Sequence, residues 1–124
     1  WWSQGWHLPM LQRNSDSEIA AIIEPVAAPR STLNKDMKTT KELGELYSVP
    51  VFGSVDEFLA SDVASRTDGI VVASNHATHA EIGLKALRAG IHVLMEKPMT
   101  TDPKEALDLA KAAAASDRIF MVNN

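Results

Sequence analysis

The fold of this chain is decided by residues 68–98, which read DGIVVASNHATHAEIGLKALRAGIHVLMEKP. Two short runs in this stretch, Gly69–Ala73 and Val93–Met95, are continuously apolar rather than alternating. Such runs are typical of strands that are covered on both faces. Between them, Thr78-x-x-Glu81 fits the capping-box pattern that opens a helix. The stretch therefore predicts a strand–helix–strand unit.

The same alternation extends through the rest of the chain. Further apolar runs occur at Ile19–Ile23 and Ile119–Val122, and the shorter run Val49–Phe52 contains Pro50, which suits a strand near an edge. Residues Trp6–Arg13 are expected to be the remainder of an earlier helix. Other predicted helix starts are Thr39-x-x-Glu42, Ser54-x-x-Glu57 and Asp102-x-x-Glu105. This order of elements predicts a doubly wound α/β domain with a mostly parallel, Rossmann-like sheet over residues 1–124.

Composition excludes several classes of function. A net charge of −4 argues against a nucleic-acid surface, which needs clustered Lys and Arg. The chain has no cysteine, so it has no disulfide framework and no thiolate metal site. No apolar run approaches the roughly 18–20 residues that span a bilayer, so no membrane association is expected.

The chain opens on Trp1-Trp2 without a methionine, which we interpret as truncation. No signal peptide is visible, and a cytoplasmic protein is expected.

In a doubly wound sheet, ligands bind beyond the carboxyl ends of the strands. Glu24 follows the first complete strand, where a carboxylate can accept hydrogen bonds from the ribose of an adenine nucleotide. The alternative is a solvated acid at a strand end. Arg30 and Ser31, in the long stretch that follows, could meet a 2′-phosphate and favour NADP, or could belong to a surface loop.

The segment Ser74–His79 follows the second long apolar run and opens a helix. Backbone amides at a helix start favour a phosphate or another electron-rich group. His76 and His79 are spaced as two metal ligands could be, but neither a cysteine nor a clear third ligand lies nearby. We therefore expect no metal, and we expect His76 to pack on its neighbours.

The tripeptide Glu96-Lys97-Pro98 follows the next apolar run. Lys97 beside a carboxylate at a strand end could hydrogen-bond a substrate hydroxyl and help its proton leave as hydride departs. Taken alone, the tripeptide is more typical of an ordinary turn.

Together these segments resemble the Gfo/Idh/MocA oxidoreductases. The stretch Ala86–Pro98 is the most diagnostic. The matching segments, in the family's order, are Gly5–Pro9, Glu24, Asp68–Asn75 with His79, Ala86–Pro98, Asp102–Ala115 and Arg118–Val122.

The resemblance implies a domain that binds NAD or NADP and serves hydride transfer at a hydroxyl-bearing carbon of a sugar, inositol or related compound. It implies that Lys97 is catalytic and that the bond before Pro98 is cis. The residues it implies for cofactor binding are Gly5, Trp6, Glu24, Ser74, Asn75, His79, Glu96, Lys97 and Pro98. Because the Glu24 carboxylate would repel a 2′-phosphate, NAD is expected rather than NADP.

Three features depart from the family's pattern. The strand and first glycines that would precede Trp1 are absent, Asn75 stands where the family often has proline, and the chain stops near where the substrate domain would begin. The full-length protein is expected to be a homo-oligomer. A dinucleotide-binding sensor or scaffold without catalysis remains an alternative. A flavodoxin-like receiver is a further alternative, but it would need a cluster of acidic residues at the first strand end, and Glu24 is the only residue here that fits.

Overall fold

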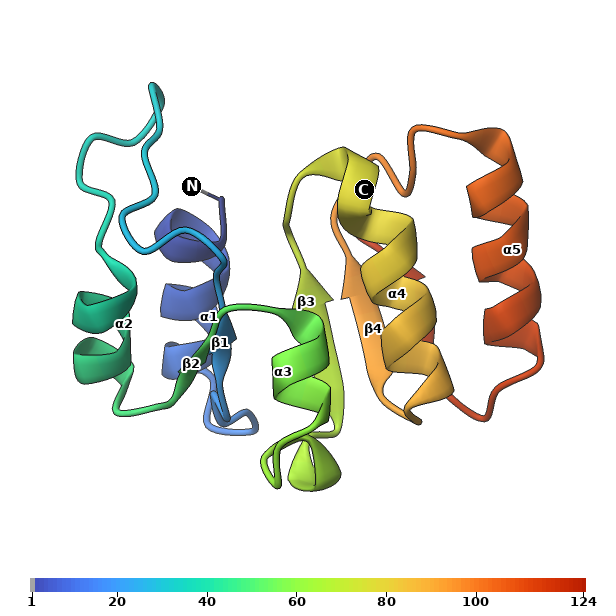
Figure 1. Cartoon of the computed structure of the whole chain (residues 1–124), viewed down its shortest axis with the longest axis horizontal. Helices are drawn as coiled ribbons and strands as arrows, with labels where there is room; N and C mark the ends of the chain where they lie inside the picture. The colour runs from blue at the N-terminus through green and yellow to red at the C-terminus, as the bar shows by residue number, and fades with distance from the viewer. Residues whose placement is uncertain (1) are drawn as a thin grey trace. The chain divides into compact units, whose positions relative to one another are not determined.

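The structure is a computed structural model that describes residues 2–124, so that Trp1 lies outside the described residues. The chain divides into two compact units, the first ending at Arg66 and the second beginning at Thr67. Both units contain helices and parallel strands (Figure 1). The helix and strand order of the prediction is therefore confirmed, while the single domain over residues 1–124 stays a prediction.

The second unit contains a parallel sheet with strand order β3-β4-β5. In this sheet Ile70 lies opposite Val93, which lies opposite Phe120. The predicted strand–helix–strand unit is confirmed, because the helix α4 connects β3 and β4. The elements are β3 (Gly69–Val72), the short helix η3 (His76–Thr78), α4 (His79–Arg88), β4 (His92–Met95), α5 (Pro103–Ala114) and β5 (Phe120–Val122).

The core of this unit lies where α4 and α5 pack on the sheet. Met95 and Leu109 are fully buried there. Gly83 of α4 faces them so closely that a Cβ atom on it would lie 2.7 Å from Cε of Met95 and 2.9 Å from Cδ2 of Leu109. The helix α4 can therefore approach the sheet only because this position lacks a side chain. Gly90, with a φ of 77°, ends α4 in the left-handed region that favours glycine.

The first unit contains a two-stranded parallel sheet in which Ile22 pairs with Val51. Its small core joins Leu8, Ile22 and Leu43. The strand β1 is shorter than the predicted run Ile19–Ile23, because β2 offers only two residues for pairing. The elements are η1 (Ser3–His7), α1 (Leu8–Arg13), β1 (Ile22–Ile23), α2 (Thr40–Tyr47), β2 (Val51–Phe52), α3 (Val55–Leu59) and η2 (Ala64–Arg66).

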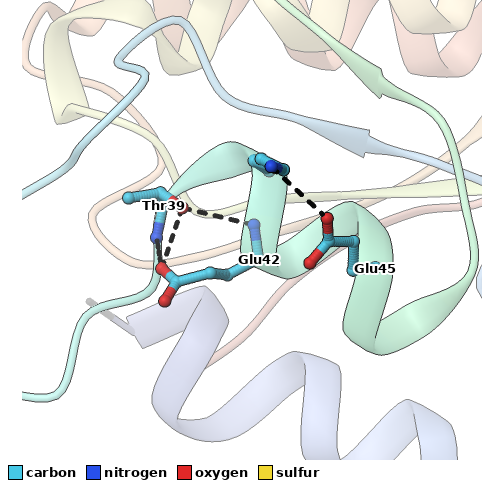
Figure 2. Close-up of polar contacts among 4 residues, drawn as sticks. Thr39, Glu42 and Glu45 are labelled. Carbon is cyan, nitrogen blue, oxygen red and sulfur yellow. Dashed lines mark hydrogen bonds and ion pairs between the residues drawn. The ribbon is translucent and has the colours of Figure 1, made fainter.

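The capping box predicted at the start of α2 is confirmed (Figure 2). The Thr39 hydroxyl accepts a hydrogen bond from the Glu42 amide at 3.2 Å, and the Glu42 carboxylate accepts one from the Thr39 amide at 2.7 Å. The Thr39 amide, with the Thr39 hydroxyl beside it, holds the pKa of the Glu42 carboxyl below its ordinary value. Figure 2 also shows Glu45, whose carboxylate pairs with Lys41 at 3.9 Å.

The capping box predicted at Thr78 is wrong. Thr78 precedes α4, but its side chain makes no cap hydrogen bond to the helix. Its hydroxyl donates instead to the carbonyl of Asn75 at 2.7 Å, and Asn75 accepts from the amide of Ala77 at 3.1 Å. The turn η3 therefore occupies the groups that a capping box would have used.

Two other predicted starts are capped in modified form. Ser54 accepts from the amide of Glu57 at 3.1 Å, but the Glu57 carboxylate accepts from the amide of Gly53 rather than of Ser54. Asp102 accepts from the amide of Lys104 at 2.8 Å, one residue earlier than the pattern requires. No helix within residues 2–124 is long and apolar enough to cross a membrane.

Candidate functional site

The predicted site residues of the second unit follow two neighbouring parallel strands. Ser74 comes shortly after β3, and Glu96 comes directly after β4. Val72 and Met95 are paired in the ladder, and the Glu96 amide continues it by donating to the Val72 carbonyl at 2.8 Å. The structure therefore brings both strand ends to one edge of the sheet, as the topology predicts.

A buried histidine joins the loops that leave this edge. The His79 side chain is fully buried at the first position of α4. Its Nδ1 lies 2.9 Å from the carbonyl oxygen of Pro98, and its Nε2 lies 3.3 Å from that of Ser74. A neutral imidazole carries a single N–H. Both partners are acceptors, so a neutral ring donates to one of them, and the shorter contact favours donation from Nδ1 to Pro98.

Glu96 is held inward, with only 8% of its surface exposed. Its Oε1 accepts a hydrogen bond from Nδ2 of Asn123 at 2.7 Å, and the Asn123 amide donates to the Met95 carbonyl at 2.7 Å. Asn123 directly follows β5, so a third strand end contributes to this edge. Asn123 was not among the site residues predicted from the sequence, although the rule that identified Glu24 and Glu96 also applies to it.

Lys97 and Pro98 lie on the surface, in contrast to the buried Glu96. The peptide bond between them is cis, as the family resemblance implied. An exposed ammonium thus stands next to a fixed carboxylate. This arrangement can present a proton donor or acceptor to a small molecule at the sheet edge.

The loop after β3 is held by its own side chains. The hydroxyls of Ser74 and Thr78 lie 2.8 Å apart, and Asn75 accepts from the Ala77 amide. Asn75, where the family often has proline, therefore orders the turn through its side chain. Ser74 and Asn75 are both exposed, so their polar atoms can meet a ligand.

The remaining predicted residues belong to the first unit. Gly5 and Trp6 are exposed within η1, so Gly5 forms part of a helix rather than a glycine-rich turn. The rings of Trp2 and Trp6 are stacked with centroids 6.0 Å apart.

Glu24 follows β1 and lies on a surface depression of the first unit. Its Oε1 accepts a hydrogen bond from the Val26 amide at 3.0 Å, which fixes the carboxylate at the start of the loop. The second oxygen, Oε2, remains an acceptor for a sugar hydroxyl. Other residues that line the depression are Pro25, Ala27, Thr40, Lys41 and Gly53.

The two closely spaced histidines do not form part of a metal cluster. The rings of His76 and His79 are in edge-to-face contact with centroids 5.5 Å apart, as expected for packing. Within residues 2–124, no three His, Cys, Asp or Glu side chains are grouped so that they could hold a metal ion.

Comparison with known proteins identifies the family to which these features point. Residues 3–124 match the profile described as "Oxidoreductase family, NAD-binding Rossmann fold", the Gfo/Idh/MocA family. The chain is 27% identical over 106 residues to inositol 2-dehydrogenase from Corynebacterium glutamicum. This alignment covers 86% of this chain and 28% of that protein. It is 32% identical over 88 residues to trans-1,2-dihydrobenzene-1,2-diol dehydrogenase from Danio rerio, covering 70% of this chain and 25% of that protein.

The fold matches solved structures over nearly the whole chain. A 3-ketoreductase from Actinomadura kijaniata, solved in complex with NADP and TDP-benzene, matches with a TM-score of 0.79 and 28% identity. The match covers 98% of this chain and 34% of that chain. The chain thus spans about a quarter to a third of the length of these relatives.

Proposed function

This chain belongs to the Gfo/Idh/MocA oxidoreductase family as its NAD-binding Rossmann domain, and from that membership we propose the reaction it serves. The proposed reaction is hydride transfer between a nicotinamide cofactor and a hydroxyl-bearing carbon of a sugar, inositol or related compound. The observation that carries the proposal is the exposed Lys97 directly after the buried Glu96, beside the Ser74 loop, at the carboxyl edge of a parallel sheet.

The cofactor, when bound, supplies the carbon that accepts or gives the hydride. As the neutral amine, Lys97 would accept the proton of the substrate hydroxyl as the carbonyl forms and would become an ammonium, and in the reverse direction the ammonium would return that proton. Glu96 would keep a negative charge near Lys97, since Asn123 fixes the Glu96 carboxylate at the strand end. Ser74 and Asn75, whose side chains are exposed, would offer polar atoms to the cofactor.

Glu24 would bind the adenosine ribose of the cofactor through Oε2. Its charge supports NAD over NADP, because a 2′-phosphate placed beside this carboxylate would be repelled. The 3-ketoreductase from Actinomadura kijaniata was solved with NADP, so the family accommodates that cofactor too.

Replacement of Lys97 tests the proposal directly. In the protein expressed from its complete reading frame, Lys97→Ala should lower kcat by roughly 10²- to 10⁴-fold, the usual contribution of a general acid–base group. The Kd for NAD should change little. Turnover is measured from the absorbance of the reduced nicotinamide with a panel of inositols and aldoses.

Lys104→Ala is the matched control, because Lys104 is an exposed lysine on α5 of the same unit. It should leave kcat unchanged. Near-normal turnover of Lys97→Ala would overturn the catalytic role of Lys97. Tight NAD binding by a wild-type protein that oxidises none of these compounds would favour a dinucleotide-binding sensor or scaffold instead.

A further inference from the structure

We propose that His79 is a positioning residue for Lys97, acting through the carbonyl of Pro98. This inference rests on the proposed function, because it assigns to His79 the task of placing the lysine that the reaction uses. The family resemblance places His79 among the cofactor-binding residues. Its surroundings point to an indirect role instead.

Burial removes the His79 ring from direct contact with a ligand. The side chain is 0% exposed. Its two ring nitrogens lie 2.9 Å and 3.3 Å from protein carbonyl oxygens, so both of its polar atoms already face partners within the unit. A cofactor could not hydrogen-bond this imidazole without displacing one of the loops.

The hydrogen bond to Pro98 lets the ring set the position of the loop that carries Lys97. His79 is the first residue of α4, whose position on the sheet is set by the close approach of Gly83 to Met95. A hydrogen bond from this helix to Pro98 restrains the loop one residue beyond Lys97. The other ring nitrogen, Nε2, lies 3.3 Å from the Ser74 carbonyl, in the loop that follows β3. The imidazole therefore transmits the position of a packed helix to the lysine.

Amide side chains can separate the two contacts. The Nδ2 atom of asparagine can occupy the place of imidazole Nδ1, and the Nε2 atom of glutamine can occupy the place of imidazole Nε2. Since the Pro98 contact is the shorter one, His79→Asn should preserve most of the effect. His79→Gln should behave like His79→Ala.

The first experiment measures kinetics in the protein expressed from its complete reading frame. His79→Ala should lower kcat on the order of 10- to 100-fold, as expected for a displaced catalytic group, with a smaller change in KM. His79→Asn should recover most of the loss. Leu87→Ala is the matched control, because Leu87 is another buried side chain of α4 but lies near the C-terminal end of the helix, away from His79. It should lower Tm and leave kcat unchanged.

A double-mutant cycle then asks whether His79 acts through Lys97. In the Lys97→Ala background, His79→Ala should cause no further loss of kcat, because the group that it positions is gone. The same fold loss in both backgrounds would overturn the proposal. A wild-type kcat in His79→Ala would overturn it as well.

Hydrogen exchange tests the contact itself and does not depend on turnover. Without ligand, His79→Ala should exchange about tenfold faster than wild type in residues 97–101, the effect of losing the one hydrogen bond of ordinary strength that the ring donates to Pro98. Equal exchange in the two proteins would overturn the proposal. If His79→Ala exchanges faster than wild type but the wild-type protein oxidises no substrate, the proposed function is contradicted while the role of the His79 contact stands.

Discussion

At the scale of single residues, His92 links two strands through its side chain. The amide of Ile119 donates a hydrogen bond to Nδ1 of His92 at 2.8 Å. The carbonyl of the same residue, Ile119, accepts a hydrogen bond from the Val93 amide at 2.9 Å. Nδ1 must be unprotonated to accept, so the hydrogen of the neutral ring lies on Nε2. His92 thereby extends the ladder to the residue that precedes β5.

Replacing His92 should destabilise this edge of the sheet. His92→Leu removes the acceptor and should lower the free energy of unfolding by about 1 kcal/mol, the usual net value of one hydrogen bond. His92→Asn can place its amide oxygen where Nδ1 was and should retain most of the stability. Urea denaturation measures both. Equal midpoints for His92→Leu and wild type would contradict the importance of this bond.

At the scale of elements, the start of α2 depends on an ionised carboxylate. The hydrogen bonds that lower the pKa of Glu42 favour its charged form in the folded protein. A group whose pKa is lowered by folding stabilises the protein above its unfolded pKa, about 4.3 for glutamate. That stabilisation is lost as the pH falls through the lower pKa of the folded state.

Glu42→Gln should therefore remove part of the acid sensitivity. Wild type should be more stable than Glu42→Gln near neutral pH, and the difference should shrink as the pH falls below that unfolded value. Thermal unfolding across this range measures the difference. Glu45→Gln, which removes the same charge from the same helix but no cap, is the control. A difference that stays constant with pH would show that Glu42 does not act as a charged cap.

The packing of α4 on the sheet should tolerate no side chain at Gly83. Alanine would gain about 1 kcal/mol in helix propensity, but overpacking a filled core costs about 1–3 kcal/mol. Because Met95 and Leu109 are fully buried, we expect Gly83→Ala to lower the free energy of unfolding by about 1 kcal/mol in urea titrations.

A second background checks the cause. In Met95→Ala, which removes the atom nearest the new Cβ and leaves only the close approach to Leu109, Gly83→Ala should be less destabilising than in the wild-type background. The same destabilisation in both backgrounds would show that crowding against Met95 is not its origin.

At the scale of the whole molecule, cofactor binding should couple to stability. A ligand that binds only the folded state adds about 2.7 kcal/mol to stability when present at 100 times its Kd. NAD should therefore raise the Tm of the protein expressed from its complete reading frame, and NADP at the same concentration should raise it less. Glu24→Ala should reduce the difference between the Tm increases that NAD and NADP cause, because it removes the charge that would repel a 2′-phosphate.

Thr40→Ala provides a control, because Thr40 lines the same depression without adding a charge. It should leave the difference between NAD and NADP in place. A larger Tm shift with NADP than with NAD would overturn the assigned preference. Light scattering of the same protein would test the expected homo-oligomer.

Much of this architecture could be predicted because the determining interactions are local in sequence. The continuous apolar run at Val93–Met95 and the four residues from Thr39 to Glu42 each contain the information that specifies a strand or a cap. Their structures match the prediction. Parallel neighbouring strands then require that the residues after β3 and β4 meet at one edge. The placement of Ser74 and Glu96 at the same edge of the sheet follows from that rule.

Tertiary structure alone decided what the side chains do at that edge. The alternation of elements and the residues that follow each strand can be predicted from the sequence, because periodicity and capping depend on neighbours along the chain. The sequence could not determine that His79 is buried between two carbonyls, or that Asn123 contacts Glu96 across 27 residues. These contacts depend on how closely α4 and β5 approach β4. That approach is set by packing among side chains that are distant in sequence, so it emerges only when the chain is folded.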